Sequence, residues 1–475
     1  MSSNSGVIVN RSNDTSPFFQ ALQSRNSKSL PELYSAEVNT ESAAQSVVEV
    51  ESSSSAGTSR TIRIELPRYG LLNRVYLHTV FSPMTGTETT AHYIKQVPFL
   101  GAAVIKEARL SYNGATLQKT DGFQIVADIM KNGSDKEIKH LQELLGGYDA
   151  NTGTLSGVTG ASLSKFGNAG GTGVGTSHRS MVGTGANNGI QDFYCPLDFY
   201  FSAKHSPNRS LDLSVLSSPV ILEIDVESSA NLFLATNSGV GAPTLTNISA
   251  MCYMTELDLE VEKNYRALSY QAGGSPLTQI AFNTERVVVA SNVSVTSSDE
   301  VVDVKLNQFT GNVYKLVIYC VKTDNFATNL SRIKPLAIQE IQLKATGTNI
   351  VNQDNLQNKE AILESYHSGG NFHPLASNVP YTNIDFNPSN IYELNFKKPY
   401  DMSKVSNSGS VALGQLSVPS LRVVLQGSGN TGQFGADAVT TGSYSADIHV
   451  VAYSTSLMSY NTNASGSTSI RMIQN

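Results

Sequence analysis

The chain has 475 residues, which is enough for two or three domains that each bury a hydrophobic core. Its net charge of −6, with no run of Lys and Arg, excludes a basic face or tail for binding nucleic acid. Charged residues make up only 15%, tryptophan is absent, and Ser, Thr, Asn and Gly fill the stretches between short apolar runs. This composition is typical of a β-protein with polar turns and long surface loops.

Residues 1–55 form a predicted polar N-terminal arm. The arm has a small apolar cluster at Pro17-Phe18-Phe19, but it is too polar to fold alone, so we expect it to dock on the protein body, on a neighbouring copy or on a membrane surface. Met1–Asn10 lacks the pattern of a secretory signal, and no run is long enough to span a bilayer, so we expect a soluble protein.

The first half then alternates strands and turns. Thr61–Leu66 shows strict alternation, and Val75–Phe81 is nearly continuously apolar, which indicates deeper burial. Ile105–Leu117 contains the hairpin turn Asn113-Gly114. Two helices are predicted next, at Phe123–Met130 and from a capping box at Ser134 and Glu137 to Leu145.

Gly146–Gly189 is a tract of Gly, Ser, Thr and Asn. A phosphate-binding loop needs a preceding strand and a GK[ST] motif that opens a helix, and the tract has neither. We therefore interpret it as a long surface loop.

Further strands follow, joined by a linker with Gly273-Gly274 and interrupted by a helical stretch near Asn355–Tyr366. The predicted strands are Phe193–Phe201, Val220–Val226, Leu257–Val261, Ile280–Phe282, Arg286–Ala290, Val302–Leu306, Leu316–Val321, Ile338–Leu343, Ile391–Phe396, Leu421–Leu425 and Ile448–Tyr453. Many short strands of antiparallel character favour a sandwich over βαβ units.

The two halves repeat the same pattern in the same order, which predicts two similar domains in tandem. Ile105, Glu107, Leu110, Gly114, Leu117 and Asp121 recur at one offset as Ile338, Glu340, Leu343, Gly347, Ile350 and Asp354. Ile64, Leu66 and Tyr69 likewise match Val304, Leu306 and Phe309, and Leu213, Leu216 and Pro219 match Leu413, Leu416 and Pro419.

No catalytic, cofactor-binding or metal-binding residue is predicted. The three cysteines, Cys195, Cys252 and Cys320, lie apart in apolar runs without CxxC spacing, which indicates buried thiols in a reducing compartment. The eight histidines are interpreted as surface or loop residues: His367 and His373 lie in a glycine-broken loop, and His449 faces away from its apolar strand neighbours. Asp299, Glu300 and Asp303 are read as a solvated strand end, and no GxSxG motif occurs.

With this repeat, the sequence resembles the double jelly-roll major capsid proteins of tailless icosahedral DNA viruses, the lineage of membrane-containing phages, adenovirus hexon and large algal viruses. The resemblance rests on Cys195–Ser202, on Leu211–Leu216 followed by Val220–Val226, on Asn113-Gly114 with its following helix, and on the closing segments Ile448–Tyr453, Tyr460-Asn461 and Ile470–Ile473.

The resemblance implies an all-β fold of two tandem eight-stranded antiparallel jelly rolls with short helical insertions and long loops. It also implies a structural, non-enzymatic role: homotrimers of pseudo-hexagonal outline that tile an icosahedral virion shell. The implied partners are the chain itself, minor capsid or penton proteins and an internal membrane, without direct nucleic-acid binding. Its implied location is the virion, after synthesis in the host cell cytoplasm.

The expected organisation is an arm at 1–55, a first roll at 56–265, a linker at 266–278, a second roll at 279–460 and a tail at 461–475. Two alternatives stay open. A receptor- or carbohydrate-binding β-sandwich protein, such as a spike or adhesin, would carry exposed aromatic clusters in its loops, whereas Phe166 and Phe434 are isolated. An enzyme on a tandem sandwich would need an acid, base or metal set.

Overall fold

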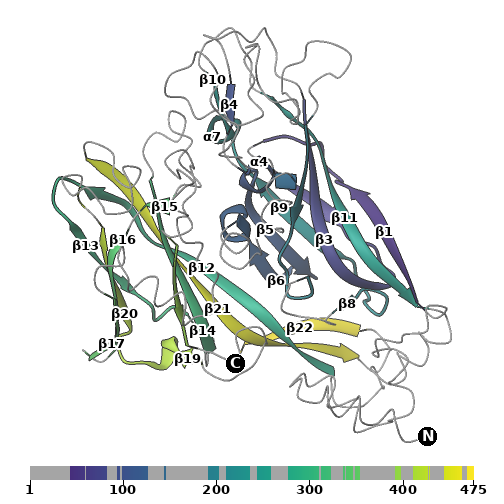
Figure 1. Ribbon diagram of the computed structural model, residues 1–475. Coiled ribbons are helices and arrows are strands. Elements are labelled where there is room, and N and C mark those ends of the chain that lie inside the picture. Colours follow the sequence, from purple (N-terminus) through teal and green to yellow (C-terminus); the bar gives the residue numbers. More distant parts are fainter. Residues whose placement is uncertain are drawn as a thin grey trace, which may run out of the picture.

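The computed structural model describes an all-β chain whose strands are paired antiparallel (Figure 1). The residues that it describes are 43–58, 60–82, 94–96, 99–126, 144–145, 191–202, 210–235, 243–257, 277–309, 312–322, 335–336, 338–345, 348–353, 391–396, 410–425, 427, 443–462 and 468–474. The predicted arm before residue 43, most of the second helix, the glycine tract, the linker before Leu277 and the helical stretch at 355–366 lie outside this part of the chain.

The first jelly roll packs two sheets face to face. One has the strand order β2 (Thr61–Glu65), β9 (Val220–Val226), β5 (Ile105–Tyr112), β6 (Ala115–Thr120). The other has the order β1 (Ala43–Glu51), β11 (Leu245–Leu257), β3 (Leu71–Phe81), β7 (Gln191–Pro196), with β8 (Leu211–Asp212) also on β3. Short elements complete this half: β4 (Ile94–Gln96) paired with β10 (Phe233–Ala235), α4 (Leu100–Ala103) and α7 (Ser229–Leu232).

The second roll repeats this arrangement. Its first sheet has the order β13 (Glu300–Lys305), β20 (Ser420–Leu425), β16 (Ile338–Ala345), β17 (Thr348–Gln353). Its second sheet has the order β12 (Leu277–Val295), β21 (Tyr444–Thr462), β14 (Asn312–Lys322), β15 (Pro335–Leu336). The strands β18 (Tyr392–Asn395) and β19 (Val411–Ala412) pair with β14, β22 (Thr468–Gln474) pairs with β21, and η5 (Leu413–Gln415) follows β19.

Irregularities in strand pairing recur at the positions that the sequence repeat predicts. β5 shifts register against β9 between Ile105 and Glu107, and β16 shifts against β20 between Ile338 and Glu340. A second shift follows Leu110 in the β5–β6 hairpin and Leu343 in the β16–β17 hairpin. Because a bulge changes which face later side chains occupy, its recurrence shows that the two halves share their register as well as their strand order.

One predicted correspondence is wrong by a residue. The Leu66 amide donates to the Val220 carbonyl at 2.9 Å, and the Leu306 amide donates to the Pro419 carbonyl at 3.0 Å. Since Leu66 and Leu306 are equivalent, Pro419 is the counterpart of Val220 and not of Pro219. The loop before β20 is therefore one residue shorter than the loop before β9. A constant offset between the two halves of the sequence cannot show at which position that residue is missing.

Alternating side chains build a core within each roll. Along β9 the buried residues are Val220, Leu222, Ile224 and Val226, and along β20 they include Leu421, Val423 and Leu425. They pack against the inward residues of the facing sheet, such as Leu77 in the first roll and Ile318 in the second. Burial of a side chain of this size contributes about 1.5–3 kcal/mol, so these two layers carry the fold.

The predicted hairpin turn is confirmed. Asn113 (φ 49°) and Gly114 (φ 79°) both lie in the left-handed region, as a two-residue turn between twisted strands requires. A helix begins where predicted, since residues 122–126 are helical, and Leu144 and Leu145 of the second predicted helix are helical too.

Several segments differ from the sequence expectations. The separate strands predicted at Ile280–Phe282 and Arg286–Ala290 form one strand, β12. Ala43–Glu51, placed in the arm, forms β1, because Val48 and Val50 pack on the first core although polar residues surround them. Part of the predicted tail forms β22. The strand predicted at Phe193–Phe201 ends at Pro196, where the Ser202 side chain closes a turn by accepting from the Phe199 amide. Only Leu257 of the strand predicted at Leu257–Val261 lies among the described residues, and there β11 already begins at Leu245, where small residues obscure the alternation.

Candidate functional site

The two rolls contact each other through a surface that is buried within the chain. Figure 1 shows the sheet that contains β14 and β21 facing the first roll, on the side of β5 and β6. The outward side chains of these two strands are buried there together with the core of the first roll. They are Val317, Tyr319 and Val321 of β14 and Val451 of β21, and each is at most 5% exposed.

Phe123 is the residue of the first roll that meets Tyr319. The two rings are stacked, with centroids 4.0 Å apart and planes at 20°. Asp121 begins this helical turn by accepting a hydrogen bond from the Gln124 amide at 2.9 Å. A side chain at Gly122 would place its Cβ 1.8 Å from the Ala102 carbonyl oxygen, so only glycine allows the close approach that positions Phe123.

His449 lies in the same contact. Its ring is stacked on Tyr319, with centroids 4.8 Å apart, and the residue is only 7% exposed. It does face away from Ile448 and Val450, as predicted, but it is not a surface histidine because the first roll covers that face. The continuous apolar run of β14 was the sequence signal for burial on both faces.

A polar cluster occupies the outer face of the first roll. His78 Nδ1 lies 2.8 Å from Glu49 Oε1, and the Ser249 hydroxyl donates to the same oxygen at 2.5 Å. The pKa of Glu49 is held below its usual value by the hydrogen bond from Ser249 and by that from His78. The His78 ring is stacked on Tyr194, with centroids 4.5 Å apart.

This Ser, His and Glu set does not have the geometry of a nucleophilic site. Ser249 is fully buried, and its hydroxyl donates to the Glu49 carboxylate at 2.5 Å, while His78 Nδ1 lies 3.3 Å away. His78 thus turns one and the same ring nitrogen to both the serine and the glutamate, whereas a catalytic triad uses the two different nitrogens of its histidine. The three side chains come from β11, β3 and β1, so the cluster joins three neighbouring strands. The sequence did not predict this cluster, because Glu49 lies within residues 1–55, which were expected to form the arm.

The outer face of the other sheet is charged. Arg109 donates from Nη2 to both carboxylate oxygens of Asp225, at 2.9 and 3.1 Å, and lies near Glu107 and Glu223. These side chains are about one-third exposed, so each pair contributes little to stability. They keep this face polar.

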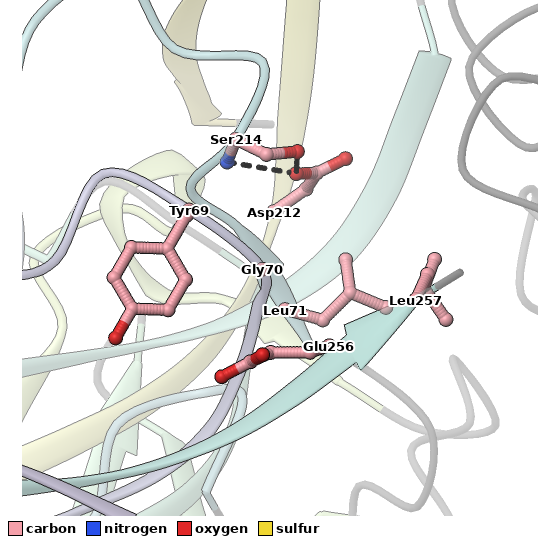
Figure 2. A pocket seen from close by; sticks show the side chains of 7 residues that line it. All are labelled: Tyr69, Gly70, Leu71, Asp212, Ser214, Glu256 and Leu257. Carbon is pink, nitrogen blue, oxygen red and sulfur yellow. Dashed lines mark hydrogen bonds between the residues drawn. The ribbon is translucent and has the colours of Figure 1, made fainter. Parts of the chain in front are cut away.

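A hollow of about 170 Å³ lies beside the start of β3 (Figure 2). It is smaller than the pockets of about 300–1,000 Å³ that hold small molecules. The Asp212 carboxylate in its wall accepts from the amide and hydroxyl of Ser214, at 3.0 and 2.6 Å, which makes a local turn. Figure 2 shows the Asp212–Ser214 pair above Gly70 and the Glu256 carboxylate below it, so these polar groups do not converge.

The remaining candidate residues have structural roles in the described part of the chain. Cys195, Cys252 and Cys320 are buried free thiols, as predicted; burial raises the pKa of Cys252 to about 12. Asp299 accepts from the Gly427 amide at 2.8 Å, while Glu300 and Asp303 are exposed. His367 and His373 lie outside the described residues, and no group of three His, Cys, Asp or Glu side chains among the described residues could hold a metal ion.

No helix within the described ranges has the length and apolarity needed to cross a membrane.

Comparisons with known proteins agree on one class. Residues 37–262 match the family model for the major capsid protein N-terminus. A search of curated proteins finds no match. Among solved structures, PBCV-1 VP54, fitted into a reconstruction of the virophage Sputnik, is similar with a TM-score of 0.61 at 12% identity, over 90% of this chain and 96% of that one.

Two further solved structures have similar scores. The faustovirus major capsid protein has a TM-score of 0.52 at 11% identity, over 88% of this chain and 90% of that one. The mavirus major capsid protein has a TM-score of 0.51 at 10% identity, over 90% of both chains.

The fold and these comparisons define the class: the chain is a double jelly-roll protein of the type found in major capsid proteins, which confirms the resemblance read from the sequence.

Proposed function

We propose that this chain is the major structural subunit of a virion shell, and that three copies form a block of pseudo-hexagonal outline that tiles an icosahedral face. The observation that carries the proposal is the repeated sheet order β2-β9-β5-β6 and β13-β20-β16-β17 at matched register. Three chains with two similar jelly rolls each bring six similar rolls together. A block of six similar rolls has a nearly hexagonal outline and can make similar contacts with the blocks around it.

The arrangement of side chains supports a structural role over an enzymatic one. The buried polar groups described above join strands or close turns, and none of them is aimed into a cavity of substrate size. The proposed domain division is a first roll at 56–265, a linker at 266–278 and a second roll at 279–460. β1 and β22 then add one strand from each end segment to these rolls.

The proposed partners are neighbouring copies of the trimer, minor capsid or penton proteins, and an internal membrane reached by the arm. The proposed location is the virion, after synthesis in the host cytoplasm. Three buried thiols, none of them paired, fit synthesis in a reducing compartment.

Sedimentation and electron microscopy of the purified full chain test the proposal. We expect a species of three times the 50.9 kDa chain mass, seen in negative stain as near-hexagonal blocks. A protein that stays monomeric at micromolar concentration would contradict the shell role and favour a binding module.

A further inference from the structure

We infer that the apolar cluster Pro17-Phe18-Phe19 of the N-terminal arm docks in the hollow beside the start of β3, on the first roll of the same chain. Such docking takes place within one chain and therefore does not depend on the proposed trimer. The hollow is then a binding surface for the arm. Of the three docking places that the sequence left open for the arm, this one is the protein body.

The hollow has the size and lining for one aromatic ring. Its volume of about 170 Å³ is below that of most ligand pockets, but a protein cavity of about 150 Å³ holds benzene. Tyr69, Leu71 and Leu257 supply apolar surface to it, and Tyr69 is 45% exposed (Figure 2). A ring that enters the hollow is therefore removed from water against apolar side chains.

A terminal segment of the chain covers the equivalent place in the second roll. Thr455 of β21 pairs with Asn312 at the start of β14, and from Ser456 onward β21 pairs with β22 (Figure 1). β12 occupies the other side of β21 along this stretch, so β22 continues the position of β14 in the sheet. The second sheet is thus extended by a segment near the C-terminus.

The first roll has the same register but no such strand among the described residues. Thr255 of β11 pairs with Leu71 at the start of β3, directly after a register shift, as in the pairing of β21 with β14. Beyond this pair, Glu256 is bonded to Ala44 on the β1 side, and the hollow lies on the β3 side. By this equivalence, the hollow is the place where a terminal segment of the chain would lie.

The arm leaves the fold next to the hollow. β1 begins at Ala43, which pairs with Leu257 in the wall of the hollow. Phe19 precedes Ala43 by 24 residues, and a flexible chain of that length spans about 25–30 Å on average. A tether of this kind gives the cluster an effective concentration of about millimolar at the hollow, which favours the hollow of the same chain over that of a neighbour.

The apolar cluster is the part of the arm that fits this hollow. Phe18 and Phe19 are the only phenylalanines before residue 43, and in an extended segment their rings point to opposite sides, so one ring enters the hollow. Residues 11–28 carry three basic residues and one acidic residue, whereas the charged residues of the wall, Asp212 and Glu256, are both acidic. The two surfaces are therefore complementary in charge. The residues before the cluster remain available to the other proposed partners.

Limited trypsin digestion of the full-length chain tests the docking. Arg25 and Lys28 closely follow the cluster, so a docked arm shields these cleavage sites, and the cleavage rate follows the fraction of undocked arm. We expect the double variant Phe18→Ala, Phe19→Ala to be cleaved about tenfold faster than wild type, because burial of one phenylalanine ring favours the docked arm by at least about that factor. Leu30→Ala, in the same arm but outside the cluster, is the matched control and should be cleaved at the wild-type rate. Equal rates for all three proteins would overturn the docking.

Photo-crosslinking of the full-length chain tests the place of docking. We would place p-azidophenylalanine at position 18, and in a second protein at position 19, and mix isotope-labelled with unlabelled chains. We expect adducts within one chain that map to residues 69–71, 212–214 or 256–257. Adducts between chains would overturn docking on the same chain, and adducts elsewhere, or none, would overturn the hollow as the docking place. Because both measurements concern one chain, a wild-type protein that stays monomeric would contradict the proposed trimer but not this docking.

Discussion

The rings of Phe123 and Tyr319 stack across the two rolls, with centroids 4.0 Å apart and planes at 20°. Phe123 follows the β6 hairpin of the first roll, and Tyr319 lies on the outer face of β14 in the second. Both rings are almost fully buried. This contact joins the second roll to the core of the first.

Phe123→Ala should weaken this link. Removal of a buried aromatic ring costs about 3–5 kcal/mol, and here the loss falls on the contact between the rolls, so we expect a single unfolding transition to separate into two. Differential scanning calorimetry at one fixed protein concentration measures both the loss of stability and the number of unfolding transitions. Tyr69→Ala is the control, because Tyr69 is 45% exposed. A Phe123→Ala protein that unfolds like Tyr69→Ala would contradict the linking role.

Gly114→Ala should destabilise the β5–β6 hairpin through the backbone alone. Gly114 has φ 79°, and an added Cβ would meet no atom within 4 Å, so no clash contributes. The left-handed conformation costs an L-residue about 1–2 kcal/mol, and urea unfolding should show a loss of that size. Asn113→Asp, at φ 49°, is the control, since Asp tolerates this region. Equal stability of both variants would rule out the strain.

Glu49→Gln should reduce the acid sensitivity of the protein. The folded-state pKa of Glu49 is lowered by its hydrogen bonds from Ser249 and His78. The carboxylate therefore contributes stability that is present above its unfolded pKa and is lost as pH falls through the folded value. Denaturant unfolding at several pH values between about 7 and 3 should show a smaller decline for Glu49→Gln than for wild type. Glu51→Gln, on the same strand, should retain the wild-type decline; identical profiles for all three proteins would refute the assignment.

Two N-terminal truncations should separate the arm from β1. Deletion of residues 1–42 leaves β1 in place, so we expect a stable trimer that forms particles poorly. Deletion of residues 1–51 also removes the pairing with β11 and the contacts of Val48 and Val50. The two valines alone account for about 2–3 kcal/mol. Thermal unfolding and electron microscopy distinguish the two proteins. If the protein without residues 1–42 forms normal particles, the arm is not needed for assembly. If the two deletion proteins unfold at the same temperature, β1 does not contribute to the stability of the first roll.

The sequence by itself determined most of the strands and their recurrence in the two halves, because side-chain alternation and turn residues such as Asn113-Gly114 act over a few neighbours and survive as a pattern. It also indicated deeper burial for β3, from the nearly continuous apolar run Val75–Phe81. These features predicted the fold class and excluded a recognisable catalytic motif.

Only the tertiary structure decided what covers each face. The burial of His449, the entry of Ala43–Glu51 into the first sheet and the counterpart of Pro419 all depend on contacts between residues far apart in the chain. A strand's own pattern shows that one face is apolar, but not which distant segment lies against it. The loss of a single residue from a loop also moves the register without changing the alternation that follows. For this reason the outer faces of β3 and β14 look alike in sequence, yet only the structure shows that one is covered within the chain while the other is left partly exposed.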